Sequence, residues 1–254
     1  MTIPWIAAAA ALGAIIGSFL NVCIYRLPRG QSIVWPASAC PHCHRPLAWF
    51  ENIPVVSYLV LRGRCRTCRG SISVRYPIVE ALTAAMFAAG WWFYGPSLLL
   101  VSRLLFGCAL IVLFAIDLEH HLLPNVVTLP GVVVGFLLSL VAEPGWVASL
   151  IGIALGGGIL FAIAEAYYRI RHEEGLGMGD VKMLAMIGAF IGWKLTLVTL
   201  MMASVAGSAI GLLMMATGRG GMKYALPFGT FLALGAAVAA VAGPGLLEWY
   251  LGQF

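Results

Sequence analysis

The chain has few charged residues, and aspartate is nearly absent. Only 10% of its 254 residues are charged, while 61% are hydrophobic; roughly a quarter of a soluble globular domain is charged. This composition excludes a soluble domain and predicts an all-α polytopic membrane protein. Aspartate occurs only at Asp117 and Asp180. Asp117 lies at the end of one hydrophobic run and Asp180 at the start of another. An ionisable side chain at such a position indicates a functional site.

The N-terminal segment lacks the basic residues that begin a signal peptide, because its first arginines, Arg26 and Arg29, come after it. We therefore expect residues 1–25 to form a transmembrane helix and not a cleaved signal. Similar apolar runs recur, and their lengths predict about eight transmembrane helices in all. The other expected spans are 78–94, 98–117, 125–142, 147–168, 180–193, 195–217 and 227–250.

Arginines are concentrated in residues 26–76, between the first two expected spans. Positively charged loops remain in the cytoplasm, so both chain termini should lie outside. Loops 117–125, 169–180 and 219–223 then also face the cytoplasm, which places Asp117 and Asp180 on one membrane face. We expect the arginines to meet anionic lipid headgroups and not nucleic acid.

Four cysteines in this loop form two Cys-x-x-Cys pairs: Cys40, Cys43, Cys65 and Cys68. The spacing is typical of two knuckles that present four thiolates to a structural Zn²⁺. Disulfides or a redox pair are the alternatives, and a further one is a site in which His42 or His44 replaces a thiolate. A reducing cytoplasm disfavours disulfides. We therefore predict a small zinc-binding domain over residues 26–76, between the first and second transmembrane helices.

Asp180 alone, after Gly177-Met178-Gly179, fits a helix N-cap. Paired with Asp117 on the same face, it suggests a dyad in which one carboxyl group keeps its proton. The ionised member can activate water against a peptide carbonyl while the other protonates the leaving amine. Gly177 and Gly179 would let a peptide backbone approach closely.

Two other classes of protein remain possible on the residues alone. A proton or cation transporter would also use membrane acids, but transporters carry such sites near the bilayer midplane within repeats. Here the acids lie at the membrane edge and no internal repeat is visible. A membrane assembly scaffold, in which the zinc loop docks a partner, is the third interpretation.

The sequence resembles the type IV prepilin peptidases, including the leader peptidases of type II secretion, which are GxGD membrane aspartyl proteases. The resemblance covers essentially the whole chain. The matching stretches are residues 17–22, 25–28, 32–36, 38–43, 52–54, 57–58, 61–65, 72–73, 75–77, 123–125 and 177–182, together with Trp49, Cys68, Glu80 and Asp117.

The resemblance implies that Asp117 and Asp180 are catalytic and that residues 77–254 form a transmembrane aspartyl peptidase domain. The substrates would be type IV prepilins or type II secretion pseudopilins, cleaved at the cytoplasmic face of the bacterial inner membrane. It also implies N-methylation of the new N-terminal residue by S-adenosylmethionine. The alternative is a peptidase without methyltransferase activity.

A site for S-adenosylmethionine is not evident in the sequence. There is no glycine-rich nucleotide fingerprint after a strand, and residues 26–76 are too few for a dinucleotide-binding fold. Trp49, Glu51 and Asn52, beside the cysteine loop, are candidate cofactor contacts. Trp49 also fits an aromatic residue at the membrane interface.

Overall fold

The structure is a computed structural model that describes residues 3–173, 177–217 and 226–252. These residues form helices and two isolated β-bridges, with no strand. The chain packs as two compact units, residues 1–112 and 113–254, and the boundary lies inside α4 (Leu98–His120). The functional division at residues 25 and 76 stays a prediction. Residues 174–176 and 219–223 of the expected cytoplasmic loops lie outside the described residues.

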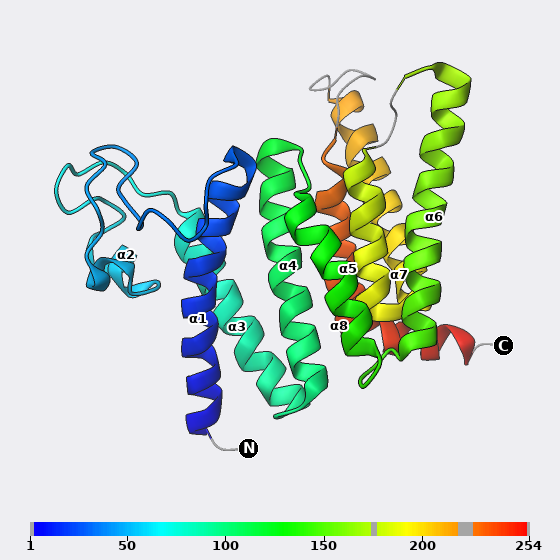
Figure 1. Ribbon diagram of the computed structural model, residues 1–254, viewed down its shortest axis with the longest axis horizontal. Coiled ribbons are helices and arrows are strands. Elements are labelled where there is room, and N and C mark those ends of the chain that lie inside the picture. Colours follow the sequence, from blue (N-terminus) through cyan, green and yellow to red (C-terminus); the bar gives the residue numbers. More distant parts are fainter. Residues whose placement is uncertain (1–2, 174–176, 218–225, 253–254) are drawn as a thin grey trace. The chain divides into compact units, whose positions relative to one another are not determined.

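In unit 1, α1 (Ile3–Arg26) and α3 (Arg75–Tyr94) pack side by side (Figure 1). Two glycines one turn apart make the close contact possible. A Cβ on Gly13 would lie 2.7 Å from the carbonyl oxygen of Thr83, and one on Gly17 would lie 2.7 Å from the Cα of Glu80. Small residues at this spacing allow helix backbones to approach closely in membranes.

The chain between α1 and α3 contains only short helices. They are η1 (Leu27–Arg29), η2 (Trp49–Asn52) and α2 (Val56–Val60). Isolated bridges join Ala39 to Pro46 and Arg64 to Ser71. So small a segment buries little apolar surface, and a bound metal is a common source of the missing stability.

Unit 2 contains the end of α4, α5 (Asn125–Ser139), α6 (Trp146–Arg171), α7 (Met178–Ala216) and α8 (Phe228–Leu251). The central helix is α7, which packs against α5, α6 and α8 (Figure 1). Its first half supplies much of the core, where Met183, Leu184, Met186 and Ile187 are fully buried.

The chain reverses direction within α7. Gly192 has φ 73° and ψ 170°, which interrupts the helix. A Cβ on Gly156 of α6 would lie 2.6 Å from the carbonyl oxygen of Leu184 and 3.2 Å from Cγ2 of Thr196. A straight helix would separate Leu184 from Thr196 by about 18 Å. Residues 178–191 and 193–216 are therefore two antiparallel segments, with the break at Gly192 and not at the expected Lys194.

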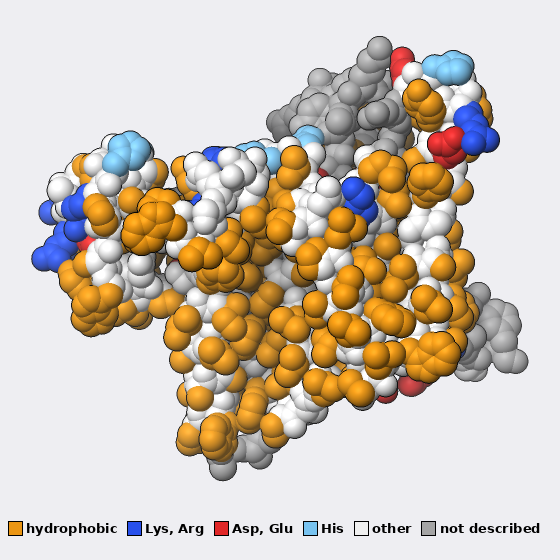
Figure 2. Space-filling view, viewed as in Figure 1, with side chains coloured by type: hydrophobic (Ala, Val, Ile, Leu, Met, Phe, Trp, Pro, Cys, Tyr) orange, Lys and Arg blue, Asp and Glu red, His pale blue; other side chains and the backbone are white. Residues whose placement is uncertain are grey.

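Four helices in the described residues are long and apolar enough to cross a membrane: α1, α4, α6 and α7, the last counted across its break at Gly192. Shorter apolar helical stretches are α5 (Asn125–Ser139) and the part Phe228–Gly243 of α8. Figure 2 shows hydrophobic side chains covering the outward faces of helices in each unit, as a lipid environment requires. The all-α membrane fold is thus confirmed, while the expected total of about eight spans is not.

Candidate active site and metal centre

Asp117 is held in place by Thr230. Asp117 lies near the end of α4, is only 5% exposed, and accepts two hydrogen bonds on Oδ2. The backbone N–H of Thr230 donates one over 2.6 Å, and the Thr230 hydroxyl donates the other over 3.0 Å. Both groups come from the first turn of α8, where backbone N–H groups have no partner within the helix.

Asp180 is the third residue of α7 and lies near Asp117. The helix begins at Met178 and its N-cap residue is Gly177, so the interpretation of Asp180 as the N-cap is wrong. Asp180 is half-buried, and the two carboxyl groups are close enough for the charge of Asp117 to act on Asp180. Residues far apart in the sequence thus form one acidic pair in unit 2.

Leu123 and two glycines pack around this pair. A Cβ on Gly179 would lie 3.0 Å from the Cβ of Leu123. One on Gly229 would lie 2.9 Å from Cδ1 of Leu123 and 3.0 Å from Oδ2 of Asp117. These glycines therefore let the starts of α7 and α8 approach the end of α4. Gly177 is exposed and under no such constraint.

A hydrogen bond joins the two motifs of unit 2 at residues 123–125 and 177–182. Lys182 donates from Nζ to Oδ1 of Asn125 over 2.9 Å, which connects the first turns of α7 and α5. Sequence reasoning identified both motifs but missed Gly229 and Thr230. The available signal was a proline, a glycine and a threonine directly before an apolar run, which is typical of a helix N-terminus.

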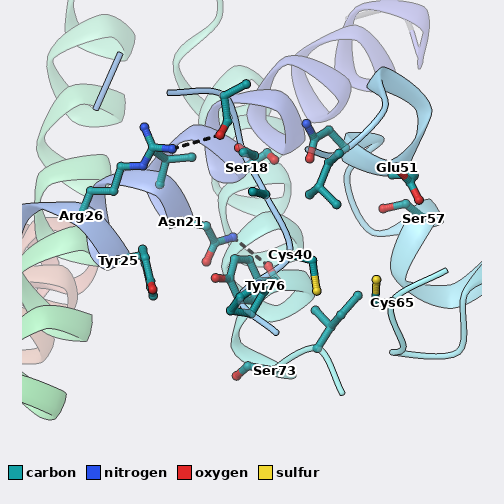
Figure 3. A pocket seen from close by; sticks show the side chains of 18 of the residues that line it. Ser18, Asn21, Tyr25, Arg26, Cys40, Glu51, Ser57, Cys65, Ser73 and Tyr76 are labelled. Atoms are coloured by element: carbon teal, nitrogen blue, oxygen red, sulfur yellow. Dashed lines mark hydrogen bonds between the residues drawn. The ribbon is translucent and has the colours of Figure 1, made fainter. Parts of the chain in front are cut away.

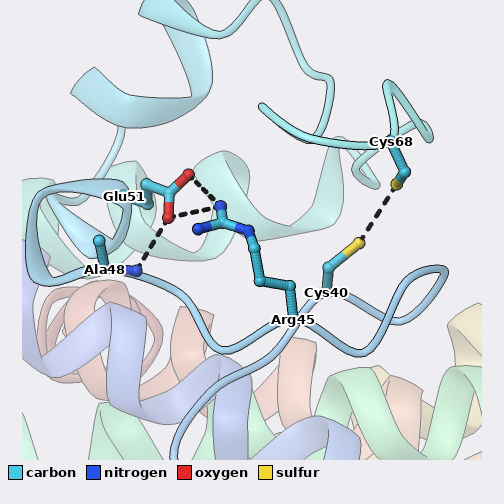
Figure 4. A network of polar contacts seen from close by, with 5 residues as sticks. All are labelled: Cys40, Arg45, Ala48, Glu51 and Cys68. Atoms are coloured by element: carbon cyan, nitrogen blue, oxygen red, sulfur yellow. Dashed lines mark hydrogen bonds and ion pairs between the residues drawn. The ribbon is translucent and has the colours of Figure 1, made fainter.

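The four loop cysteines form a cluster that can hold a metal ion. The Sγ atoms of Cys40, Cys43, Cys65 and Cys68 all lie within 4.8 Å of one another, and none is in a disulfide. The Cys40 and Cys68 sulfurs are 3.8 Å apart (Figure 4). A tetrahedron with Zn–S bonds of about 2.3 Å has S···S edges of about 3.8 Å. The donor set and its size fit zinc.

Two knuckles with the same backbone hydrogen bonds build the cluster. Cys40 N–H donates to Arg45 and the Cys40 carbonyl accepts from His44, over 3.0 and 2.9 Å. Cys65 makes the equivalent bonds with Gly70 and Arg69, over 2.8 and 3.0 Å. His44 and Arg69 both have a positive φ, at 56° and 59°. The two CxxC motifs thus adopt the same backbone conformation.

The knuckle backbone also stabilises thiolate. Hydrogen bonds from the backbone N–H groups of Cys68 and Thr67 lower the pKa of Cys65 to about 6. The backbone N–H of Gly70 lowers the pKa of Cys68, but desolvation and hydrogen bonds with the other three thiols outweigh it and raise that pKa to about 11. Thiolate is the form that binds metal.

Arg45 and Glu51 connect the first knuckle to η2 (Figure 4). Nη2 of Arg45 donates to both Glu51 carboxylate oxygens, over 2.6 and 2.8 Å. Glu51 also accepts from the N–H of Ala48 over 2.8 Å. The Ala48 hydrogen bond first, and then the Arg45 hydrogen bond, lower the pKa of the Glu51 carboxyl group. Glu51 is therefore ionised, and its hydrogen bonds hold the first knuckle against η2.

Beside the cluster, unit 1 contains a partly open cavity of about 800 Å³ (Figure 3). This volume lies within the range of about 300–1,000 Å³ typical of small-molecule sites. Its walls come from α1, α3 and the loop, and include Cys40 and Cys65. Of the candidate cofactor contacts, Glu51 and Asn52 line the cavity, whereas Trp49 does not and is 81% exposed.

Residues 11–94 match the bacterial peptidase A24 N-terminal domain, and residues 104–212 match the type IV leader peptidase family. A Burkholderia pseudomallei protein named prepilin leader peptidase/N-methyltransferase is 37% identical over 94% of this chain and 85% of its own length. Proteins of the same name from Aeromonas hydrophila and Myxococcus xanthus are 34% and 43% identical. The Aeromonas alignment covers 99% of this chain and 96% of the relative.

The Myxococcus alignment covers 84% of this chain but only 64% of the longer relative. No solved structure matches the chain. The fold and the site define a helical membrane protein with a pair of buried and half-buried carboxyl groups and a four-cysteine cluster. The matches to both domains and to relatives over nearly their full lengths are more specific: the chain belongs to the type IV leader peptidase family.

Proposed function

We propose that this protein removes the short basic leader from type IV prepilins or type II secretion pseudopilins and then N-methylates the new N-terminal residue. The observation that carries the proposal is the pairing of Asp117 with Asp180 at the packed starts of α7 and α8. The shared name of the relatives supports both activities.

In the proposed cleavage, Asp117 takes a proton from water, and the water oxygen attacks the scissile carbonyl carbon. The resulting tetrahedral species collapses when the carbon–nitrogen bond breaks, and Asp180 gives its proton to the leaving amine. Asp117 suits the role of base because hydrogen bonds from Thr230 stabilise its carboxylate. Asp180, beside that charge, suits the role of acid.

We place the reaction at the cytoplasmic face of the bacterial inner membrane, with both termini outside and lipids around the apolar helices. The arginine-rich loop and the four long apolar helices support this placement. Prepilins or pseudopilins are the proposed protein partners. Their basic leaders would meet the acidic pair electrostatically.

The four-cysteine cluster is proposed to hold one structural Zn²⁺. Four thiolates would complete its tetrahedral coordination and leave no position for a reacting water. The knuckles form walls of the unit 1 cavity, so the metal would shape that cavity without entering the chemistry.

S-adenosylmethionine is the proposed methyl donor. When bound, it supplies an electrophilic methyl group on a positively charged sulfur. The residues of unit 1 fit a site for methyl transfer, because the cavity is large enough for a nucleoside and Asn21 Oδ1 is a buried acceptor without a partner among the described residues.

The test is to incubate the purified protein with a prepilin peptide and S-adenosylmethionine and to measure product masses. The expected product lacks the leader and carries one methyl group. Asp117→Asn and Asp180→Asn should each slow cleavage by roughly 10²- to 10⁴-fold, while a peptide supplied without its leader is still methylated. Glu143→Gln, at an exposed acid of unit 2, is the matched control and should cleave normally.

Normal cleavage by either aspartate variant would disprove the dyad. Cleavage without any methylation by the unaltered protein would instead establish a peptidase alone. Thermal unfolding of the inactive variants at the same temperature as the unaltered protein would show that the loss of activity is not caused by unfolding.

A further inference from the structure

Two buried glutamates line the cavity of unit 1, and only one is neutralised. Glu51 is 8% exposed and Glu80 is 7% exposed. Arg45 pairs with Glu51. Glu80 accepts hydrogen bonds from the N–H of Val55, over 2.7 Å, and from the hydroxyl of Ser18. Both donors are neutral, and no cation in the described part of the chain pairs with Glu80.

Asn21 presents a second acceptor to the same cavity. The residue is 1% exposed, and its Nδ2 donates to the carbonyl oxygens of Gly17, over 3.3 Å, and Tyr76, over 3.0 Å (Figure 3). These two carbonyl groups fix the orientation of the amide, since the reverse would place oxygen against oxygen. Oδ1 of Asn21 is consequently a buried acceptor that has no hydrogen-bond partner in the described structure.

The carboxyl group of Glu80 and Oδ1 of Asn21 both lie where α1 packs against α3. Asn21 bonds to the backbone of Tyr76, one turn before Glu80, while Gly17 lies against the Cα of Glu80. A buried carboxyl group without a cation and a buried carbonyl oxygen without a donor are each unfavourable. A ligand with several N–H donors and a positive charge would relieve both, as a primary ammonium group does.

We propose that this cavity is the methyl-transfer site and that Glu80 and Oδ1 of Asn21 bind the α-ammonium group of the cleaved peptide. The inference rests on the proposed methyltransferase function and names the residues that receive the methyl acceptor. An α-amino group has a pKa of about 7.7–8.0 in water. It therefore arrives largely protonated and must lose one proton before it can act as a nucleophile.

The step balances with groups already named. The carboxylate of Glu80 accepts one proton from the α-ammonium group, which frees the nitrogen lone pair. A nitrogen–carbon bond forms as the carbon–sulfur bond of the donor breaks, and that electron pair stays on sulfur as a neutral thioether. The product is a methylated ammonium group, and Glu80 releases its proton to water. Asn21 holds a second N–H and orients the amine.

The test compares Glu80→Gln with the unaltered full-length chain in detergent. The ligands are a short peptide with the mature N-terminal sequence and its N-acetylated form, and calorimetry measures binding without turnover. The unaltered chain should prefer the free amine. Glu80→Gln should weaken free-amine binding about 10- to 100-fold, the usual effect of losing a charge-assisted hydrogen bond, and leave binding of the acetylated peptide unchanged.

Three measurements keep the outcome decisive. Glu80→Asp, which retains the charge, should recover part of the free-amine preference. Glu143→Gln should bind as the unaltered chain does. Zinc content should stay the same in all variants, because the cluster borders the cavity. Glu80→Gln protein that keeps its zinc and still prefers the free amine would overturn the inference alone. Absence of methylation by the unaltered protein would overturn the proposed methyltransferase function.

Discussion

The two candidate sites are built in opposite ways. In unit 2, Asp117, Asp180 and Thr230 lie at the ends of α4, α7 and α8. Glycines allow these helix ends to pack closely against one another. In unit 1, the cavity has one helical wall, from α1 and α3, and a second wall of loop with only short helices. The acids of unit 2 are thus positioned by helix packing, while the cavity of unit 1 depends on how its loop is tied together.

This difference indicates where each site is vulnerable. Helix packing is distributed over many contacts, so one change in the loop should leave it intact. The loop wall instead depends on the four thiolates and on the Arg45–Glu51 pair. Since small metal-bound segments often fold only with their metal, metal removal should separate the two sites.

The largest expected effect follows from changing both cysteines of the first knuckle, Cys40→Ser with Cys43→Ser. Two of four ligands are lost, so bound zinc should fall from about one per chain to nearly none. Methyl transfer to a leaderless peptide should fall with it, and leader cleavage should fall less. Metal analysis and product masses on the same preparation check this.

Cys23→Ser is the matched control, because Cys23 is a buried cysteine of α1 outside the cluster. It should keep its zinc. Full zinc in the double variant would rule out the four-thiolate site. Equal losses of cleavage and methylation would mean that the two sites do not differ in their dependence on the metal.

A smaller effect is expected from Thr230→Val in unit 2. The valine keeps the backbone N–H bond to Asp117 but removes the hydroxyl bond of 3.0 Å. One hydrogen bond to a charged group contributes about 1.5–3 kcal/mol, so kcat for cleavage should fall about 10- to 100-fold with KM little changed. Thr230→Ser should retain most activity. Equal cleavage rates for the valine and serine variants would show that the Thr230 hydroxyl does not contribute to cleavage.

The sequence was informative where spacing or rarity carries chemistry. The CxxC pairs predicted a cluster that the structure brings together, and the two aspartates, as the only ones, pointed to a site in which they do interact. For Thr230 the sequence offers only a helix N-terminus signal from the preceding proline and glycine, and its hydrogen bonds to Asp117 arise from folding. Glu80 is among the residues that match the family, but its lack of a cation could not be predicted, since it depends on residues brought together by folding.

Glycine shows the same limit. The Gly207 and Gly211 pair resembles a helix-packing motif, yet a Cβ on Gly207 would meet nothing nearer than 3.6 Å. The close approaches occur instead at Gly13 and Gly17 in unit 1 and at Gly152 in unit 2. The spacing permits close contact, but only the rotation of each helix decides which glycine faces its neighbour.

The smallest expected effect tests this distinction by Gly152→Ala against Gly207→Ala. A Cβ on Gly152 would lie 2.5 Å from the carbonyl oxygen of Gly188, so α6 and α7 must separate, which should destabilise unit 2 by about 1–3 kcal/mol. At Gly207 a Cβ would make ordinary van der Waals contact with Phe231, at 3.6 Å, and alanine should stabilise the helix by up to about 1 kcal/mol. Thermal unfolding in detergent should therefore shift in opposite directions. If both variants unfold below the unaltered protein, the contacts of Gly207 are tighter than its neighbours indicate.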